Sequence, residues 1–225
     1  MLTDQGFACL LAWSSPAYPI GAFSYSHGLE TLVESGAVTN AATLADYIDA
    51  VLRRGGAWTD AVLFAHAHRA GDNAQALDTI AELAAALRAT SETALESRQQ
   101  GHAFLKVTRA AWPHAALDAF SARNPGPVAH CVAAALAASA HAIPLRPALS
   151  AWLHGTAANL VSAGVRLVPL GQTDGQIALA RLLPAIAAVT DAALATPLDD
   201  LGTAAPLLEF ASMAHETLYT RLFRS

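Results

Sequence analysis

The residues best suited to chemistry in this sequence are nine histidines and two cysteines, which are typical ligands of transition metals. His66 and His68 are two residues apart, and on a helix that spacing turns their side chains about 200° from each other. His130 is adjacent to Cys131, which is equally unsuited to chelation. The other histidines are scattered along the chain, so only the fold, or a dimer, could bring them together. We therefore expect no firmly bound metal and no metal-ligand set among these residues.

The motifs of common enzyme classes are also missing. The chain has no nucleophile elbow, no paired Cys-x-x-Cys, no Rossmann glycine fingerprint and no His-Glu-x-x-His helix. Asp199 and Asp200 lie between Pro197 and Gly202, where a loop or a helix cap explains them more simply than metal-dependent catalysis. Lys106, the single lysine, follows no glycine run, so the chain is not a P-loop NTPase. We predict no catalytic residues; a helical enzyme whose polar residues converge only in three dimensions is the rival class.

The composition indicates which elements must position these side chains. Of 225 residues, 54 are alanine, the strongest helix former, whereas the alternating β-branched pattern of strands is nearly absent. We predict an all-α, bundle-like single domain over residues 1–225. The content of 54% hydrophobic and 14% charged residues excludes disorder and predicts extensive buried or partner-covered surface. A formal net charge of −5 argues against a nucleic-acid partner.

The cellular setting is predicted from cysteine use and hydropathy. Cys9 and Cys131 are far apart, which fits a reduced compartment better than a disulfide scaffold. The amino terminus lacks the basic start of a signal peptide. The apolar stretches 128–145 and 177–195 contain charged residues, histidines and prolines and are rich in weakly apolar alanine, so we expect core helices and not membrane spans. The prediction is a cytoplasmic protein without a membrane partner.

Periodicity and capping residues predict the helices and one long irregular link. That link covers residues 112–127 and contains three prolines. Thr43 and Asp46 resemble a capping pair, and Ser24 is a candidate N-cap. The expected helices cover residues 4–13, 24–35, 43–54, 58–69, 73–88, 91–111, 128–142, 147–168, 176–195 and 206 to the end.

Two helical surfaces are candidates for contact with a partner. In the helix ending at 168, Asn159, Ser162 and Arg166 share a face away from the apolar stripe; an ordinary solvated face is the alternative. The carboxyl-terminal segment, at about 207–225, ends in aromatic and arginine residues of the kind that anchor interfaces. Docking of this segment on its own core is the alternative. Its candidate anchors are Tyr219, Arg221, Phe223 and Arg224.

Four blocks together resemble the UreF family of urease accessory proteins. Three of them carry most of the resemblance: residues 15–30 (SPAYPIGAFSYSHGLE), 163–176 (AGVRLVPLGQTDGQ) and 215–225 (HETLYTRLFRS). The fourth, residues 96–101 (ESRQQG), is weaker and lies between them in the expected order. Thr220 stands where the family usually has serine. The segment from His130 to Ala133 departs from the family's pattern, so no role is assigned to His130.

The resemblance implies an all-α, usually dimeric adaptor without a catalytic site. Family members join UreD (also called UreH) and the GTPase UreG in the complex that inserts nickel into apo-urease, and they modulate the GTPase cycle of UreG. Nickel is then handled transiently by the complex, and this chain holds no cofactor firmly. A direct nickel-binding metallochaperone is the alternative function.

The resemblance also assigns candidate residues to each partner. We expect Tyr219, Arg221, Phe223 and Arg224 to be ordered against UreD. The candidate residues for UreG are Tyr25, Glu30, Arg98 and Arg166. Alternatively, Glu30 forms a buried ion pair with Arg98 or Arg166 that merely fixes the helices.

Overall fold

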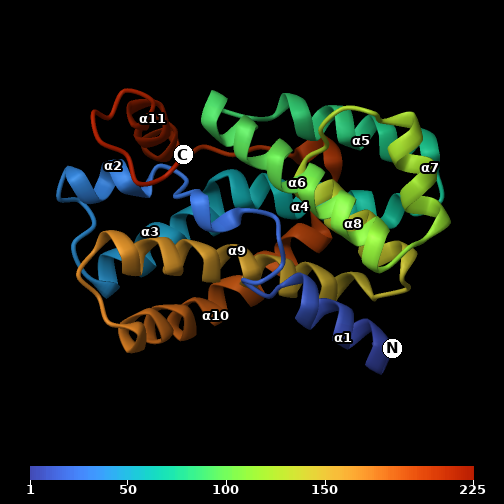
Figure 1. Cartoon of the computed structure of the whole chain (residues 1–225), viewed down its shortest axis with the longest axis horizontal. Helices are drawn as coiled ribbons and strands as arrows, with labels where there is room; N and C mark the ends of the chain where they lie inside the picture. The colour runs from blue at the N-terminus through green and yellow to red at the C-terminus, as the bar shows by residue number, and fades with distance from the viewer.

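The computed structural model describes all residues, 1–225, as eleven α-helices and two short 3₁₀ turns without any strand (Figure 1). The all-α prediction is therefore confirmed. The elements are α1 (Asp4–Trp13), η1 (Ala22–Ser24), α2 (Leu29–Glu34), α3 (Ala41–Arg54), α4 (Gly56–Ala70), α5 (Ala74–Ala86), α6 (Ser91–Ala111), α7 (Ala115–Arg123), α8 (His130–Ala140), α9 (Leu145–Leu167), α10 (Gln172–Ala195), η2 (Leu198–Asp200) and α11 (Pro206–His215).

The core lies where α3, α4, α8, α9 and α10 pack on one another. Residues 131–138 of α8 are all buried, and most of them are alanines, so neighbouring backbones approach closely. Gly101 allows α6 to approach the segment before α8 closely, because a Cβ atom at this position would lie only 2.0 Å from the carbonyl oxygen of Val128. Small residues thus set the distance between these helices, and the alanine content of the chain is a packing requirement as well as a helix signal.

Most predicted helices are confirmed within a few residues, although some caps differ. Asn40, not Thr43, is the N-cap of α3: its side chain accepts hydrogen bonds from the backbone of Ala42 and Thr43, and Thr43 reciprocates. Asn73 caps α5 through a 3.1 Å hydrogen bond from the amide of Ala76. The last helix of the core, α10, begins at Gln172 and not at 176, because Asp174 caps the amide of Gly171.

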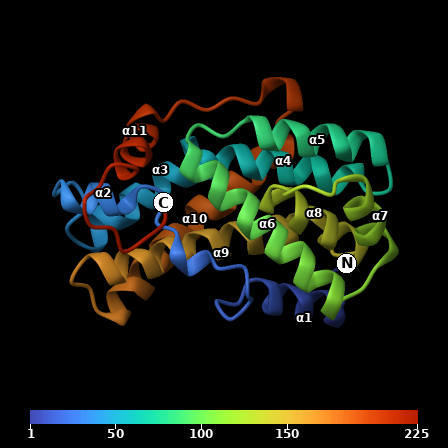
Figure 2. The ribbon, with the colours of Figure 1, turned by 45° about the horizontal axis from the view of Figure 1, so that its top comes forward.

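Three predictions of local structure were wrong. The helix expected over 24–35 is a 3₁₀ turn followed by the short α2, because His27 and Gly28 have φ angles of +60° and +81° and interrupt it. The link over 112–127 contains α7. The final helix stops at His215 instead of running to the end, and residues 216–225 turn back toward α2 (Figures 1 and 2).

Helix α10 was expected to be too weakly apolar to span a membrane, but its length and hydropathy do reach that level. It packs along α9, α3 and α4, and one face of it is buried, with Leu182, Ile186 and Val189 in the core. This helix therefore serves as a core helix in the fold, as predicted.

Candidate functional site

The carboxyl-terminal segment, residues 216–225, is docked on the molecule and is called the tail below. Its backbone is held from two directions. The amides of Leu222 and Phe223 donate to the two carboxylate oxygens of Glu30, at 2.7 and 3.0 Å. The amide of Arg224 donates to the carbonyl of Ser24 at 2.8 Å, and the amide of Ser26 donates to the carbonyl of Ser225 at 2.7 Å. The tail is thus paired with a segment that lies some 190 residues earlier in the sequence.

His215 anchors the start of the tail between two carboxylates. Its ring is completely buried, with Nε2 3.0 Å from Glu30 and Nδ1 2.8 Å from Glu92. Arg221 adds a cation, 3.0 Å from the other oxygen of Glu92. Burial raises the pKa of Glu92, while His215 and Arg221 oppose that rise.

Glu96, one turn further along α6, is the second acceptor for the tail. It accepts hydrogen bonds from the hydroxyl of Ser225 at 3.0 Å and from Gln100 at 3.0 Å, and it lies 3.3 Å from His27 Nδ1. Burial acts to raise the pKa of Glu96, but His27 and the hydrogen bonds outweigh it, so the pKa is lowered. For His27, burial is likewise outweighed by Glu96, and the pKa is raised. The two groups form an ion pair beneath the tail.

The positive φ angles at His27 and Gly28 bring this pair into place. A Cβ atom on Gly28 would lie 2.9 Å from the backbone nitrogen of Ser212 in α11. The turn therefore requires glycine, both for its left-handed backbone and for the close approach of α11. On the side of this turn away from α11, the hydroxyl of Tyr47 in α3 donates to the carbonyl of His27 at 2.7 Å.

Phe223 is the buried anchor of the tail, only 4% exposed. The guanidinium carbon of Arg166 lies 4.4 Å from the centre of its ring, a cation–π contact. Tyr25 is buried beside the tail and its hydroxyl donates to Gln99 of α6. Burial raises the pKa of Tyr25, and Arg224 nearby acts to lower it.

The structure unites most of the predicted partner-binding residues in this one cluster. Tyr25, Glu30 and Arg166, assigned to one partner, contact or adjoin the tail assigned to the other. The alternative ion pair of Glu30 with Arg98 or Arg166 does not form, because His215 and the tail amides take both oxygens of Glu30. Arg98 is exposed on α6 and bonds only the carbonyl of Ala94, and Tyr219 is fully exposed.

Sequence reasoning missed Glu92, His215 and the His27–Glu96 pair as parts of this site. A signal was present in α6, where Glu92, Glu96 and Gln100 recur every four residues. On a helix that spacing forms one polar stripe. In an otherwise alanine-rich chain, such a stripe of acidic residues on a packed helix requires partners, and here the tail and His27 supply them.

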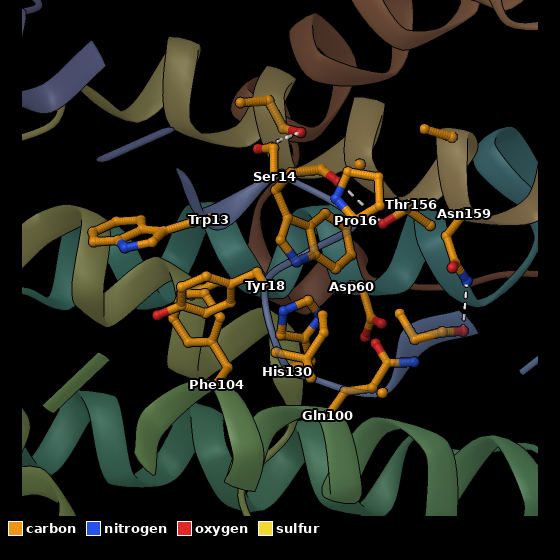
Figure 3. Close-up of a pocket in the computed structure, with 18 of the residues that line it drawn as sticks. Trp13, Ser14, Pro16, Tyr18, Asp60, Gln100, Phe104, His130, Thr156 and Asn159 are labelled. Carbon is orange, nitrogen blue, oxygen red and sulfur yellow. Dashed lines mark hydrogen bonds between the residues drawn. The ribbon is translucent and has the colours of Figure 1, made fainter. Parts of the chain in front are cut away.

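A cavity of about 380 Å³ lies on the other side of His27 and Glu96, between the segment 14–23 and helices α4, α6, α8 and α9 (Figure 3). His130 lies in it between Phe104 and Trp152, with its ring centre 5.4 and 5.9 Å from theirs. Burial lowers the pKa of His130 to about 4. Asp60 lines the cavity as well and forms a two-pronged ion pair with Arg88.

The histidines do not gather into a metal site: no three His, Cys, Asp or Glu side chains converge to hold an ion. Several of them instead bond backbone carbonyls. His66 lies 3.0 Å from the oxygen of Thr196, and His68 lies 2.8 Å from that of Ile143.

Comparison with known proteins agrees with this picture. The UreF family model matches residues 38–183. A urease accessory protein UreF of Granulibacter bethesdensis is 53% identical over 225 residues, covering 99% of this chain and 95% of that protein. A UreF of Bradyrhizobium diazoefficiens is 47% identical over 218 residues, covering 96% and 90%. A UreF of a Methylobacterium strain is 46% identical, covering 96% and 87%. The chain therefore belongs to the UreF family of urease accessory proteins.

Proposed function

We propose that this chain is a cytoplasmic, non-catalytic adaptor in urease maturation. It joins UreD (UreH) and the GTPase UreG in the complex that inserts nickel into apo-urease, and it modulates the GTPase cycle of UreG. Nickel is cargo of the complex and not a resident cofactor of this chain. Within one chain no three His, Cys, Asp or Glu side chains converge to hold an ion, which supports the adaptor over a direct metallochaperone.

The observation that carries the proposal is that some residues of the tail are buried or bonded to the core while others are exposed. Phe223 is buried and the amides of the tail are bonded to Glu30, which gives the segment a defined conformation. Tyr219 and Leu222 are exposed, at 104% and 64%. Rigid presentation of exposed aromatic and aliphatic side chains lowers the entropic cost of binding and is typical of interface anchors.

The predicted site residues then fall into two roles. Tyr25, Glu30 and Phe223 are positioning residues, since they are buried or bonded to the tail. Tyr219 and Arg224 are exposed on the docked tail and are proposed to contact UreD.

The other proposed interface faces UreG. Arg98 and Arg166 are exposed and form no ion pair, and both are proposed to contact that partner. Arg166 also lies over the ring of Phe223. Arg221, bonded to Glu92, serves both the docking of the tail and its exposed surface.

Self-association into a homodimer is part of the proposal. Helix α1 exposes Phe7 and Leu11, which are one turn apart and each more than half exposed in the single chain. An exposed apolar pair of this kind is suited to a symmetric contact.

The test is co-expression of the chain with UreD and UreG of its own organism, followed by size-exclusion chromatography with light scattering. We expect a stable complex for the intact chain and none for a chain ending at His215. Circular dichroism should show that the shortened chain keeps its helices. An intact chain that elutes alone would contradict the adaptor function, and undiminished assembly of the shortened chain would contradict the role of the tail.

A further inference from the structure

Helix α6 divides its charged residues between two faces. The polar stripe of Glu92, Glu96 and Gln100 faces the tail and the core. A second face carries three cations and a histidine, all exposed, at successive spacings of four, four and three residues. These residues, called the basic stripe, are Arg98, His102, Lys106 and Arg109. At 1.5 Å per residue the stripe is about 16 Å long.

The basic stripe is largely unmatched within the chain. Arg109 is paired with Asp118 at 2.7 Å and also bonds Ser121. Arg98, His102 and Lys106 form no ion pair. Of the ten arginines outside the stripe, six pair with a carboxylate: Arg53, Arg88, Arg123, Arg146, Arg181 and Arg221.

The stripe borders a surface hollow between α6 and α7. The hollow has a volume of about 340 Å³; His102, Lys106 and Arg109 form one side and Asp118 and Ser121 the other. Leu105 and Ala110 give it apolar contacts as well. A flat set of exposed charges binds weakly, but a hollow beside them can take a side chain of the partner and fix its register.

We propose that the basic stripe and the α6–α7 hollow form a docking surface for an acidic protein partner. Charge complementarity defines the partner: a helix or turn with carboxylates about 6 Å apart would meet the cations in register. Four residues are too few for a nucleic-acid footprint on a chain of net charge −5. No large exposed apolar side chain lies between residues 98 and 109, which disfavours insertion into a lipid surface.

The location of the stripe suggests how it would act with the tail. Gln99, next to Arg98, accepts the hydroxyl of Tyr25 beneath the tail, so the stripe begins where the tail cluster ends. Helix α6 crosses the near side of the molecule in Figure 2, and the stripe extends along it. A partner bound to the tail would therefore make a second contact with the basic stripe along α6. This part of the inference rests on the proposed function.

The single lysine makes the surface directly testable by chemistry. Carbodiimide joins a primary amine to a carboxylate in contact with it, and here the only amines are Lys106 and the amino terminus. The complex of this chain with UreD, UreG and apo-urease would be purified and treated with carbodiimide. The cross-linked peptides would then be identified by mass spectrometry. The expected result is a peptide joining Lys106 to an Asp or Glu of a partner. Lys106→Arg should keep the complex and lose this product.

A binding measurement provides the second arm. Lys106→Glu should weaken assembly about tenfold at low salt, and the difference should shrink at high salt because exposed charges are screened. Arg54→Glu is the matched control, since Arg54 is also exposed and forms no ion pair. Its assembly should stay within about twofold of the parent chain.

The outcomes separate this inference from the proposed function. A complex without any Lys106 product, in which Lys106→Glu and Arg54→Glu behave alike, would overturn the docking surface and leave the adaptor function standing. Absence of any complex would overturn both. Lys106-dependent binding of the free chain to phosphatidylserine vesicles, without a Lys106 product in the complex, would overturn the docking surface in favour of a lipid surface.

Discussion

The Nε2 atom of His215 lies 3.0 Å from a carboxylate oxygen of Glu30, and that same oxygen accepts the amide of Phe223. One side chain on α2 therefore holds both the end of α11 and the tail that follows it. The relationship explains why the last helix stops at His215: the amides of Leu222 and Phe223 find an acceptor outside any helix. The proposed partner-binding surface of the tail depends on this carboxylate.

Glu30→Gln is expected to release the tail without unfolding the core. The amide side chain keeps one acceptor oxygen but loses the charge that strengthens three contacts, a loss of about 2 kcal/mol. Hydrogen exchange should show faster exchange of the amides of Leu222 and Phe223. Unchanged protection of these amides would show that Glu30 does not hold the tail.

Gly28→Ala is expected to destabilise the protein by several times more than Gly36→Ala. Both glycines have positive φ angles, +81° and +76°, so each substitution costs about 1 kcal/mol of backbone strain. Only at Gly28 would the new Cβ meet a backbone, since nothing lies within 4 Å of the corresponding position at Gly36. Urea unfolding of the two variants measures the difference; equal losses would mean that α11 does not pack on the turn.

Docking of the tail is expected to be strongest in a middle range of pH. The pKa of His27 is raised, so its contribution is complete below about pH 6.5 and is lost as the pH rises through the raised value. The pKa of Glu96 is lowered, so its contribution is complete above about pH 4.3 and is lost as the pH falls through the lowered value.

Protection of the tail amides, measured from about pH 2 to 9 and corrected for intrinsic exchange, would report this profile. His27→Gln should remove the decline on the alkaline side and move the acidic decline to higher pH, because His27 is one of the groups that lower the pKa of Glu96. An alkaline decline that persists in this variant would assign it to another group.

Arg166→Ala is expected to reduce the free energy of docking of the tail at Phe223 by about 1 kcal/mol, the usual size of a partly exposed cation–π contact. Arg166→Lys, which retains the cation, should lose less. If Arg166 also contacts UreG, the alanine variant will lose UreG from the co-purified complex while UreD remains. Retention of both partners would confine Arg166 to positioning the tail.

Much of the fold could be predicted from the sequence because helix signals are local. Alanine content and the apolar stripes located nine of the eleven helices. The helix over 24–35 failed because two adjacent residues, His27 and Gly28, take left-handed conformations that periodicity does not report. The end of α11 failed for a different reason: Leu218 and Leu222 continue the helical spacing, but a carboxylate on α2 competes for the amides of the tail.

The sequence predicted many of the residues of the candidate site, but it did not predict how they are arranged. The conspicuous aromatic and arginine residues of the tail were identified by type, and Tyr25, Glu30 and Arg166 by resemblance. Their union with His215, Glu92 and Glu96 depends on contacts between segments more than 100 residues apart. Sequence spacing within one helix cannot specify such contacts.

The most direct test of the account is the double variant Tyr219→Ala, Leu222→Ala in the co-expression experiment with UreD and UreG. Both side chains are exposed on the docked tail, so their removal should leave the thermal unfolding midpoint and the protection of the tail amides unchanged. The account predicts that this folded, docked chain no longer assembles with UreD. Assembly equal to that of the parent chain would contradict the claim that the tail presents the partner-binding surface.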